Sequence, residues 1–389
     1  MPIAEFTCRL RDVHNGNQKL GLSLHFLAEG AANAVFAVRE VDSADIALEQ
    51  KDAKASLDCY VGFEDNSGNG RTINFPDGAV IRVPKTNPKT PKAKEIKRDF
   101  DKYIKPLFPE ELQGYLVEHD LVGLSYSVLA VLYHLLKGQE NRKHKGDIFV
   151  NPNNDHALLM RDMSSVRGKS LCIEFKPKWL YPDPAEPLDS TRCRTCAMRA
   201  YRNSQPGSHK KKTYICPLEL AYGDPEKLKP FLQGCIDDEI ERSGLRIDLP
   251  SQDYILDAML RSLTKGLAHA LILCLKKLQM AHDPRDLKTR LDEETTELNK
   301  RIAMTLRDCS MFMRVDYTRY PLVGIAEVML ADLDLKDAEK LPDWETKSLI
   351  LKQEGWFAGR EEEGTTLVEL ETCGMARRIF RKGSFQKED

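Results

Sequence analysis

The sequence lacks several features that would place it in a specialised class of protein. No stretch approaches the roughly 20 apolar residues of a membrane span, and the start MPIAEFTCRL has no apolar signal-peptide core. The most apolar segment, LVGLSYSVLAVLYHLL at 121–136, is too short to span and predicts a buried helix. Ten cysteines spread over 389 residues lack the density of a disulfide scaffold. We therefore expect no membrane association, reduced thiols, and a location in the cytoplasm or nucleus.

The chain also has little net charge, with a formal value of −2. This balance argues against a general nucleic-acid or membrane-surface protein. Basic residues are nevertheless concentrated in short runs, at 85–105, 142–145, 209–212 and 376–382. Each run alone would be explained as a solvated helix face, so the runs indicate a function only if several converge on one anionic site.

The order of the expected elements predicts the fold class. We predict short strands at LGLSLHFLA, AVFAVREV, CYVGFED and AVIRVPK within the first 85 residues, and helical periodicity from 95 to 136. The rest mixes helices, the longest at 254–281, with strands at HALLMRDM, SLCIEFKP, IAMTLRDCSMFMRV and GIAEVMLADLDLK. With 41% hydrophobic residues and no internal repeat, this is an α+β protein of about two domains. We expect a small sheet-rich N-terminal lobe (1–137) and a larger mixed C-terminal lobe (138–389), the layout of many kinases.

A loop between the first two expected strands could bind phosphate. FLAEGAANAVFAV at 26–38 places Gly30 and small residues where backbone N–H groups could approach phosphate oxygens. A tight hairpin, in which Asn33 tolerates an unusual backbone conformation, explains the same residues. Arg82 and Lys85, at the end of a later strand, would be cations within reach of a nucleotide beneath the loop.

Aspartates lie at the ends of two apolar segments. Asp308 interrupts the expected strand at 302–315, and Asp332 and Asp334 end the strand at 324–336, just before Lys336. Phosphoryl transfer needs one carboxylate to accept a hydroxyl proton and another to hold the metal that neutralises the phosphates. Strand-end caps or surface ion pairs would explain either aspartate alone, whereas the combination favours a site.

The segment CIEFKPKW at 172–179 carries three charges that a buried strand would not use, because unpaired charge is costly to desolvate. Glu174, Lys176 and Lys178 alternate, so in an extended segment they share one face. Pro177 stiffens the backbone between the two lysines. We interpret the segment as a phosphate clamp in which Glu174 either orients Lys176 or meets a nucleotide.

The segment CRTC at 193–196 has the spacing of zinc ligands, with His209 and Cys216 near it in the sequence. A single CxxC with irregular partners leaves the presence of zinc undecided. The arginines that follow matter more if the site binds anions, because guanidinium groups match phosphate in a bidentate manner; they are Arg194, Arg199 and Arg202.

Taken in order, GAAN, Glu-x-Lys-Pro-Lys, CRxC with spaced arginines, YICPLEL, RDCS and DLDLK resemble the inositol-pentakisphosphate 2-kinase family over roughly residues 26–344. The resemblance implies transfer of a phosphoryl group from ATP, with Mg²⁺, to the 2-hydroxyl of inositol pentakisphosphate, giving inositol hexakisphosphate. It also implies a two-lobed inositol-polyphosphate-kinase-like fold. We expect a monomer that binds ATP and inositol pentakisphosphate and does not bind nucleic acid or membrane.

The resemblance also implies a role for each matching residue. Asp308 would be the general base, Lys176 would lie near the transferred group, and Asp332 would hold the metal, with Asp334 a possible second ligand. The nucleotide contacts would be Gly30, Ala31, Asn33, Arg82 and Glu174. The substrate contacts would be Lys178, Arg194, Arg202, Lys336, Lys340 and Trp344, with Arg142 as a loosely aligned candidate.

Some positions depart from the family pattern. AMRAY at 197–201 stands where the family usually has a Met- and His-rich segment, and Trp344 replaces a frequent tyrosine. An Asn-Asn pair after YICPLEL is not evident, and the Cys/His zinc site of some members has no counterpart between 217 and 307. Two other readings stay open: a non-catalytic module that binds inositol phosphates or RNA, and another inositol-polyphosphate or lipid kinase.

Overall fold

The computed structural model confirms the α+β class. The chain divides into two compact units, Met1–Lys102 with Val117–Asp162, and Tyr103–Leu116 with Met163–Asp389. The structure describes residues 21–30, 32–41, 78–85, 91–124, 126–138, 156–183, 186–187, 190–206, 213–283, 293–322, 324–358 and 373–375.

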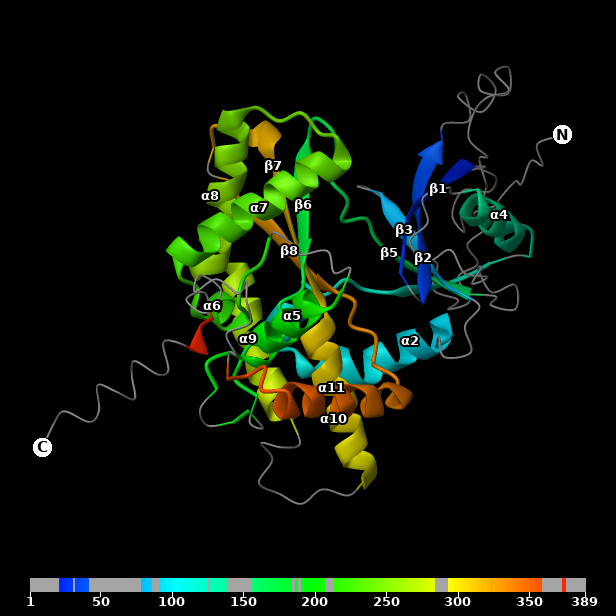
Figure 1. Ribbon diagram of the computed structural model, residues 1–389. Helices are drawn as coiled ribbons and strands as arrows, with labels where there is room; N and C mark the ends of the chain where they lie inside the picture. Colours follow the sequence, from blue (N-terminus) through cyan, green and yellow to red (C-terminus); the bar gives the residue numbers. More distant parts are fainter. Residues whose placement is uncertain are drawn as a thin grey trace, which may run out of the picture. The chain divides into compact units, whose positions relative to one another are not determined.

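The first unit contains an antiparallel five-stranded sheet of order β1-β2-β3-β5-β4 (Figure 1). Its helix α2 (Ala93–Asp99) packs on β5 through Ala93 and Ile96, which contact the buried Leu158. A π-helical turn, Phe100–Ile104, follows and runs across the boundary between the units. The bounds of the strands and of the remaining helix are β1 (Gly21–Glu29), β2 (Asn33–Val41), β3 (Ala79–Pro84), β4 (Asp120–Gly123), α4 (Tyr126–Lys137) and β5 (His156–Arg161).

Three of the strands expected near the N-terminus correspond to β1, β2 and β3, whereas CYVGFED lies outside the described residues. The apolar segment 121–136 is not one helix, because its first residues pair with β5 as strand β4 and α4 begins only at Tyr126. The first unit extends to Asp162, beyond the expected boundary at residue 137, because β5 pairs with both β3 and β4.

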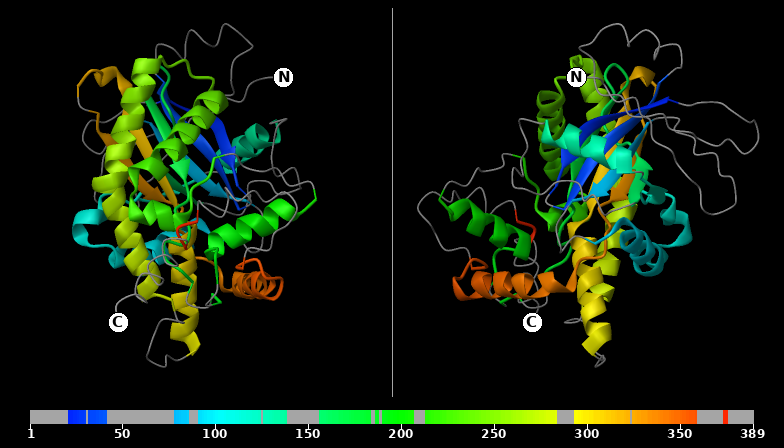
Figure 2. Two further views of the ribbon diagram at one scale, coloured as in Figure 1. Left: turned by 60° about the vertical axis from the view of Figure 1, so that its left-hand side comes forward. Right: turned by 90° about the vertical axis from the view of Figure 1, so that its right-hand side faces the viewer.

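The second unit is built on a three-stranded antiparallel sheet of order β6-β7-β8, formed by β6 (Ser170–Phe175), β7 (Ser310–Asp316) and β8 (Ala326–Ala331). Helices α7 and α8 pack on this sheet, and α9 continues from the end of α8 (Figure 2). The helices of four or more residues are α3 (Glu110–Gln113), α5 (Arg194–Ser204), α6 (Pro217–Tyr222), α7 (Pro225–Ser243), α8 (Leu249–Lys265), α9 (Leu267–Ala281), α10 (Glu293–Asp308) and α11 (Leu341–Gln353).

The expected strand at 302–315 is wrong in its first half. Helix α10 continues to Asp308, and only Ser310 begins β7. The apolar residues before Asp308 fit a helix equally well, because Ile302, Ala303 and Leu306 lie on one buried face at helical spacing. Asp308 is therefore the last residue of a helix that runs directly into a strand.

The longest expected helix, 254–281, is two helices that meet at Gly266. A Cβ atom at this glycine would lie 2.9 Å from the Cα of Ser262 in the last turn of α8, so the turn that ends α8 requires glycine. The combined segment Leu249–Ala281 is long and apolar enough to cross a membrane by length and composition. A buried core helix passes the same test, and Ile255, Leu263 and Leu271 along it are fully buried.

Candidate active site

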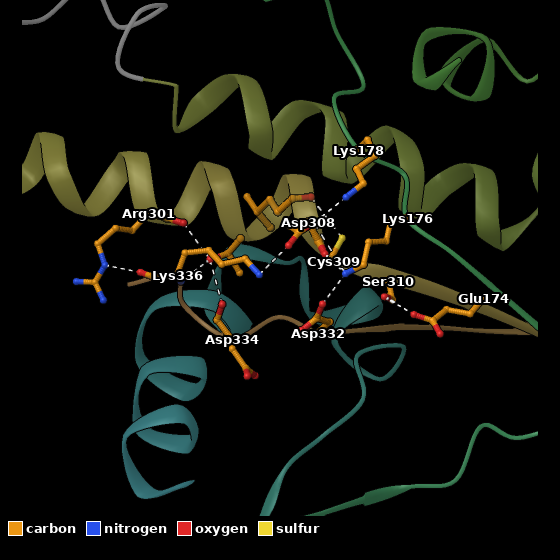
Figure 3. A network of polar contacts seen from close by, with 12 residues as sticks. Glu174, Lys176, Lys178, Arg301, Asp308, Cys309, Ser310, Asp332, Asp334 and Lys336 are labelled. Atoms are coloured by element: carbon orange, nitrogen blue, oxygen red, sulfur yellow. Dashed lines mark hydrogen bonds and ion pairs between the residues drawn. The ribbon is translucent and has the colours of Figure 1, made fainter. Parts of the chain in front are cut away.

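Three strand ends meet at one edge of the second sheet. Strand β6 ends at Phe175, which pairs with Met311 near the start of β7, and Ser310 pairs with Ala331 at the end of β8. Residues that follow β6, precede β7 or follow β8 are therefore brought to the same end of the sheet, although Lys176 and Asp332, for example, are 156 positions apart in the chain. Figure 3 shows the polar side chains that gather there.

Three lysines surround the carboxylate of Asp308 (Figure 3). Lys178 Nζ lies 2.7 Å from Oδ1, Lys336 Nζ lies 3.0 Å from Oδ2, and Lys176 Nζ lies 3.9 Å from Oδ1. The side chains of Asp308, Lys176 and Lys178 are 40%, 33% and 37% exposed, so water and ligands can reach them. We call Lys176, Lys178, Asp308, Asp332 and Lys336 the lysine–aspartate cluster.

Lys176 links the two catalytic candidates. Its ammonium group donates to Asp332 Oδ2 at 2.6 Å and to the main-chain carbonyl of Asp308 at 2.6 Å. The helix α10 ends at that carbonyl, and a cation is favoured beside the negative end of a helix dipole. Lys176 thus holds the end of α10 against the segment that follows β8.

The charges of the cluster shift two pKa values in opposite directions. Partial burial alone would raise the pKa of Asp308, but Lys336, Lys178 and Lys176 outweigh it and hold that pKa well below its usual range. Partial burial alone would lower the pKa of Lys176, but Asp332, with a smaller contribution from Asp308, raises it. Asp308 is therefore a carboxylate and Lys176 an ammonium ion throughout the physiological pH range.

Two members of the cluster have left-handed backbone conformations. Lys178 has φ 61° and Asp332 has φ 56°, and these are the non-glycine residues with positive φ in the described part of the chain. Such conformations cost about 1–3 kcal/mol each and occur preferentially at functional sites. Asp332 directly follows β8, and Lys178 lies three residues after the end of β6. The expected extended conformation of 174–178 is thus wrong at Lys178, although Lys176 and Lys178 do converge on Asp308.

The buried Gln279 of α9 fixes this turn. Its Nε2 donates to the carbonyls of Lys178 (2.8 Å) and Leu306 (3.0 Å), and its Oε1 accepts the N–H of Leu180 at 3.0 Å. One fully buried amide therefore joins the segment after β6 to the last turn of α10. Sequence reasoning missed Gln279; the available signal is a polar residue at i+4 from the buried Leu275 on an apolar helix face.

A sequence profile of the inositol-pentakisphosphate 2-kinase family matches residues 26–348, which include the whole cluster. The chain belongs to this family. An inositol-pentakisphosphate 2-kinase from Yarrowia lipolytica is 26% identical over 205 residues, which cover 52% of this chain and 59% of that relative. The matched part is thus less than two thirds of the relative's length.

Other residues that the family resemblance singles out lie near the cluster in different ways. Glu174 is exposed and accepts the hydroxyl hydrogen of Ser310 at 2.7 Å. In Figure 3 the Asp332 carboxylate faces Lys176, whereas that of Asp334 points away from Asp308. A second metal ligand at Asp334 stays a prediction, as does a nucleotide contact at Glu174.

The backbone after β8 is tied to α10 by residues that sequence reasoning also missed. Arg301 Nε donates to the carbonyl of Lys336 at 2.7 Å. Thr305 Oγ1 accepts the N–H of Lys336 at 3.0 Å and donates to the carbonyl of Asp334 at 3.2 Å. Thr305 lies one helical turn before Asp308 on α10, so these bonds place Lys336 beside Asp308. The exposed Lys340 and the half-buried Trp344, farther along, make no contact with Asp308 among the described residues.

Two of the three arginines of α5 stack on aromatic rings, and the third is exposed. Arg194 is 6% exposed, lies over the Trp179 ring at 4.7 Å and approaches Asp183 at 4.0 Å. Arg199 lies over the ring of Tyr214 at 4.1 Å, whereas Arg202 is exposed. The family resemblance implies that both Arg194 and Arg202 contact the substrate, and this stays a prediction. The buried position of Arg194 also gives it an evident packing role.

In the first unit, the expected nucleotide loop joins β1 to β2. Gly30 N–H donates to the carbonyl of Asn33 at 2.9 Å, and the buried Lys85 binds both Glu29 Oε2 and the Gly30 carbonyl at 2.7 Å. Lys85 is therefore an anchor for the loop. Arg82 lies on β3 between Val35 and Leu158 and is 7% exposed. Ala31 and Arg142 lie outside the described residues.

Proposed function

We propose that this protein transfers the γ-phosphoryl group of ATP to the 2-hydroxyl of inositol pentakisphosphate, giving inositol hexakisphosphate. The observation that carries the proposal is the lysine–aspartate cluster within a chain of the matching family. Five phosphates on one small ring require many cations, and each lysine offers a charge-assisted hydrogen bond to an anionic oxygen.

The lysines that face the Asp308 carboxylate could bind a phosphate group in the same way. Lys178 and Lys336 each approach Asp308 within 3.0 Å, and a phosphate oxygen would accept the same bonds. When these lysines turn to the substrate, the force that lowers the pKa of Asp308 weakens and the carboxylate becomes a better proton acceptor. Substrate binding would thereby prepare the base that acts on the substrate.

Proton transfer would use Asp308 and the hydroxyl it faces. The transition state of phosphoryl transfer is loose and spreads charge over the transferring group, so the base mainly orients the hydroxyl and takes its proton late. Lys176, held by Asp332 and the end of α10, would offset the charge that develops on the transferring oxygens. Its raised pKa keeps it cationic for this role.

The cluster also suits a magnesium ion, because a carboxylate oxygen is a ligand that Mg²⁺ prefers and Asp332 is 41% exposed. Asp332 would hold the ion, which would offset charge on the β- and γ-phosphates of ATP. In the first unit, Asn33 Oδ1 is buried without a hydrogen-bond partner among the described residues, and no atom lies within 4 Å of a Cβ position at Gly30. These two features fit a bound nucleotide.

The test is to incubate the chain with ATP, Mg²⁺ and inositol pentakisphosphate and to look for hexakisphosphate carrying the new phosphate at the 2-position. The Asp308→Ala variant should lose turnover and still bind pentakisphosphate by calorimetry. Substantial remaining 2-kinase activity in that variant would exclude Asp308 as the base. Binding without turnover in the wild type would favour the non-catalytic alternative, and phosphorylation of a different inositol phosphate or a lipid would favour the other kinase reading.

A further inference from the structure

A buried contact accompanies the exposed ion pair between Lys178 and Asp308. Trp179 follows Lys178 in the chain, and Arg307 precedes Asp308 in the last turn of α10. The guanidinium group of Arg307 lies over the Trp179 ring at 3.7 Å, while Lys178 Nζ lies 2.7 Å from Asp308 Oδ1. Trp179 and Arg307 are 9% and 4% exposed. Each member of the exposed pair is therefore joined by one peptide bond to a member of a buried pair.

A buried carboxylate also holds Arg307. Arg307 Nη2 donates to Asp283 Oδ2 and to the hydroxyl oxygen of Tyr181, and that hydroxyl donates to the same Oδ2 at 2.7 Å. Asp283 is 1% exposed and lies two residues after α9 ends at Ala281. A carboxylate near the negative end of a helix is unfavourable unless a cation accompanies it, and Arg307 is that cation. Arg307, Asp283 and Tyr181 thus form a charge-balanced unit that joins the ends of α9 and α10.

Stability alone would not require an ion pair at this place. Burial of both charges carries a large desolvation penalty, and well-packed apolar residues of similar volume often replace such pairs without loss of stability. Arg307 Nε is in addition buried without a hydrogen-bond partner among the described residues. What the pair adds is a defined geometry, because a planar guanidinium held by a carboxylate and an aromatic ring is fixed in orientation. This favours a role in determining where neighbouring groups lie.

The position of Arg307 determines the direction in which the Asp308 side chain leaves α10. Successive side chains of an α-helix point about 100° apart, so an arginine fixed in the interior turns the next residue away from it. The main chain on both sides is held as well. Gln279 Nε2 donates to the Leu306 carbonyl at 3.0 Å, and Lys176 Nζ donates to the Asp308 carbonyl at 2.6 Å. These two bonds hold the last turn in place, and the Arg307 side chain fixes its rotation.

The same guanidinium group supports the backbone turn at Lys178. Lys178 has φ 61°, which a lysine rarely adopts, so the packing of its neighbours has to stabilise the turn. The next residue is Trp179, whose ring is covered by Arg307 at 3.7 Å and approached by Arg194 at 4.7 Å. Because one side chain holds both Trp179 and the end of α10, a displacement of Arg307 would move Lys178 relative to Asp308.

We propose that Arg307, paired with Asp283 and stacked on Trp179, is a positioning residue for the phosphoryl transfer, because it sets the orientation of Asp308 relative to Lys178. The inference rests on the proposed function and adds a buried support to the exposed lysine–aspartate cluster. Arg307 is 4% exposed and acts through its neighbours rather than on the substrate. Its loss should therefore lower kcat far more than it changes the KM for ATP.

The first test removes both buried charges at once in the full-length chain. Asp283→Leu/Arg307→Met puts apolar side chains in place of the pair, so Tm should stay close to the wild-type value. We expect kcat with pentakisphosphate to fall by about 10- to 100-fold, because small errors of alignment are costly in catalysis, while the KM for ATP stays near the wild-type value. Sites are counted by calorimetric titration with pentakisphosphate, so that an unfolded fraction does not enter kcat. A folded double variant with wild-type kcat would overturn the proposal.

Conservative variants decide the matter if the double variant does not fold. Arg307→Lys keeps a cation beside Asp283 but loses the planar contact with Trp179, so it should lower kcat. Trp179→Phe keeps an aromatic ring and should retain most of kcat, whereas Trp179→Leu should not. The control for stability is Ile255→Ala, at a fully buried position of α8, which should lower Tm and leave kcat unaltered. Equal losses of kcat in Ile255→Ala and Arg307→Lys would reduce Arg307 to a structural role.

A third measurement needs neither activity nor ligand. Lys178→Met and Asp308→Asn, made singly and together, give the coupling between the two side chains from unfolding in urea. We expect a favourable coupling in the wild-type background and its loss in the Arg307→Lys background, where the two groups are no longer aligned. Equal coupling in both backgrounds would contradict the proposal. A wild-type chain without 2-kinase activity would instead refute the proposed function, and this cycle would still decide whether Arg307 positions Asp308.

Discussion

The lysines after β6 and β8 and the arginines of α5 were all expected to bind phosphate, yet they differ in burial and partners. Lys176 and Lys178 are about one-third exposed, and they form ion pairs with Asp332 and Asp308 in the lysine–aspartate cluster. Arg194 is almost fully buried and lies over Trp179, a ring that Arg307 also approaches, at 3.7 Å.

The difference shows which cations a ligand could recruit. An exposed ammonium on a flexible stem can exchange an aspartate for a phosphate with little reorganisation. A buried guanidinium stacked on an aromatic ring would have to give up that packing and its ion pair with Asp183. We therefore expect substitutions in the lysine–aspartate cluster to change catalysis, and substitution of Arg194 to change mainly stability.

The largest expected effect is that of Asp308→Asn. It keeps the shape of the side chain but removes the proton acceptor, and general bases contribute about 10²–10⁴ in rate. We expect kcat to fall by about 10³-fold while affinity for pentakisphosphate is retained or increased, because Lys178 and Lys336 are released. Asp343→Asn makes the same change in an exposed pair with Lys347 and should leave kcat unaltered. A kcat near the wild-type value in Asp308→Asn would show that the Asp308 carboxylate is not needed for catalysis.

Lys176→Met should have the next largest effect. It keeps the aliphatic stem but removes the charge that faces Asp332 and the end of α10. Losing one preorganised electrostatic contact commonly costs about 10²–10³ in rate, so we expect kcat/KM to fall by about 10²-fold in steady-state assays. The matched control is Lys347→Met on α11, which is 40% exposed and should leave kcat/KM unchanged. Equal losses in both variants would mean that general charge, rather than the cluster, determines the rate.

Gln279→Leu tests whether the cluster depends on its buried support. The change leaves two carbonyls and one N–H without their partner, at a cost of about 1–3 kcal/mol for each buried group. We expect a clear fall in the free energy of unfolding in urea and a KM for pentakisphosphate raised by about tenfold. Gln233→Leu, an exposed α7 position that bonds Asp237, should change neither quantity. An unchanged KM in a folded Gln279→Leu variant would show that the backbone turn at Lys178 keeps its conformation without Gln279.

Arg194→Lys and Arg202→Ala compare a buried and an exposed arginine of the same helix. Arg194→Lys keeps the charge but loses the planar contact with Trp179, so we expect a lower Tm with little change in KM. Arg202→Ala removes an exposed cation, so we expect an unchanged Tm and a KM raised by a few-fold, as for a solvent-screened contact. Calorimetry and substrate titration of both variants decide the matter. A large KM effect from Arg194→Lys with no loss of Tm would make Arg194 a substrate contact.

The sequence predicted the chemistry of the site better than its geometry. Lysines and aspartates separated by apolar runs indicated a site for polyanions, and the structure brings Lys176, Lys178, Asp308 and Lys336 together. Their arrangement depends on antiparallel pairing between strands over 130 residues apart, which no local pattern encodes. Hydrophobic periodicity also could not decide whether 302–308 was helix or strand, because a short apolar run fits both.

The supporting residues were the hardest to predict. Gln279 acts through a buried amide, and Arg307 through a guanidinium group 126 residues from its partner Tyr181. The αL conformations of Lys178 and Asp332 were missed for a related reason. Lysine rarely adopts φ near +60°, and aspartate, although enriched there, adopts it in only a small fraction of cases, so the sequence alone does not indicate these turns.

The smallest expected effect is the pH dependence that Asp308 gives to stability. The pKa of its carboxyl is lower in the folded than in the unfolded chain, so its ionised form stabilises the fold. That contribution is fully present above the ordinary aspartate pKa of about 3.9 and is lost as pH falls toward the folded value. The stability difference between wild type and Asp308→Asn in urea should therefore be constant from about pH 7 to 5 and smaller at pH 4. For Lys176 the pH dependence runs in the opposite direction, because its raised pKa adds stability that is lost only as pH rises above the ordinary lysine value of about 10.4.

The Asp308 effect on stability should be modest because the side chain is 40% exposed and solvent screens its ion pairs. A difference that grows as the pH is lowered would mean that Asp308 is not held as a carboxylate by the three lysines.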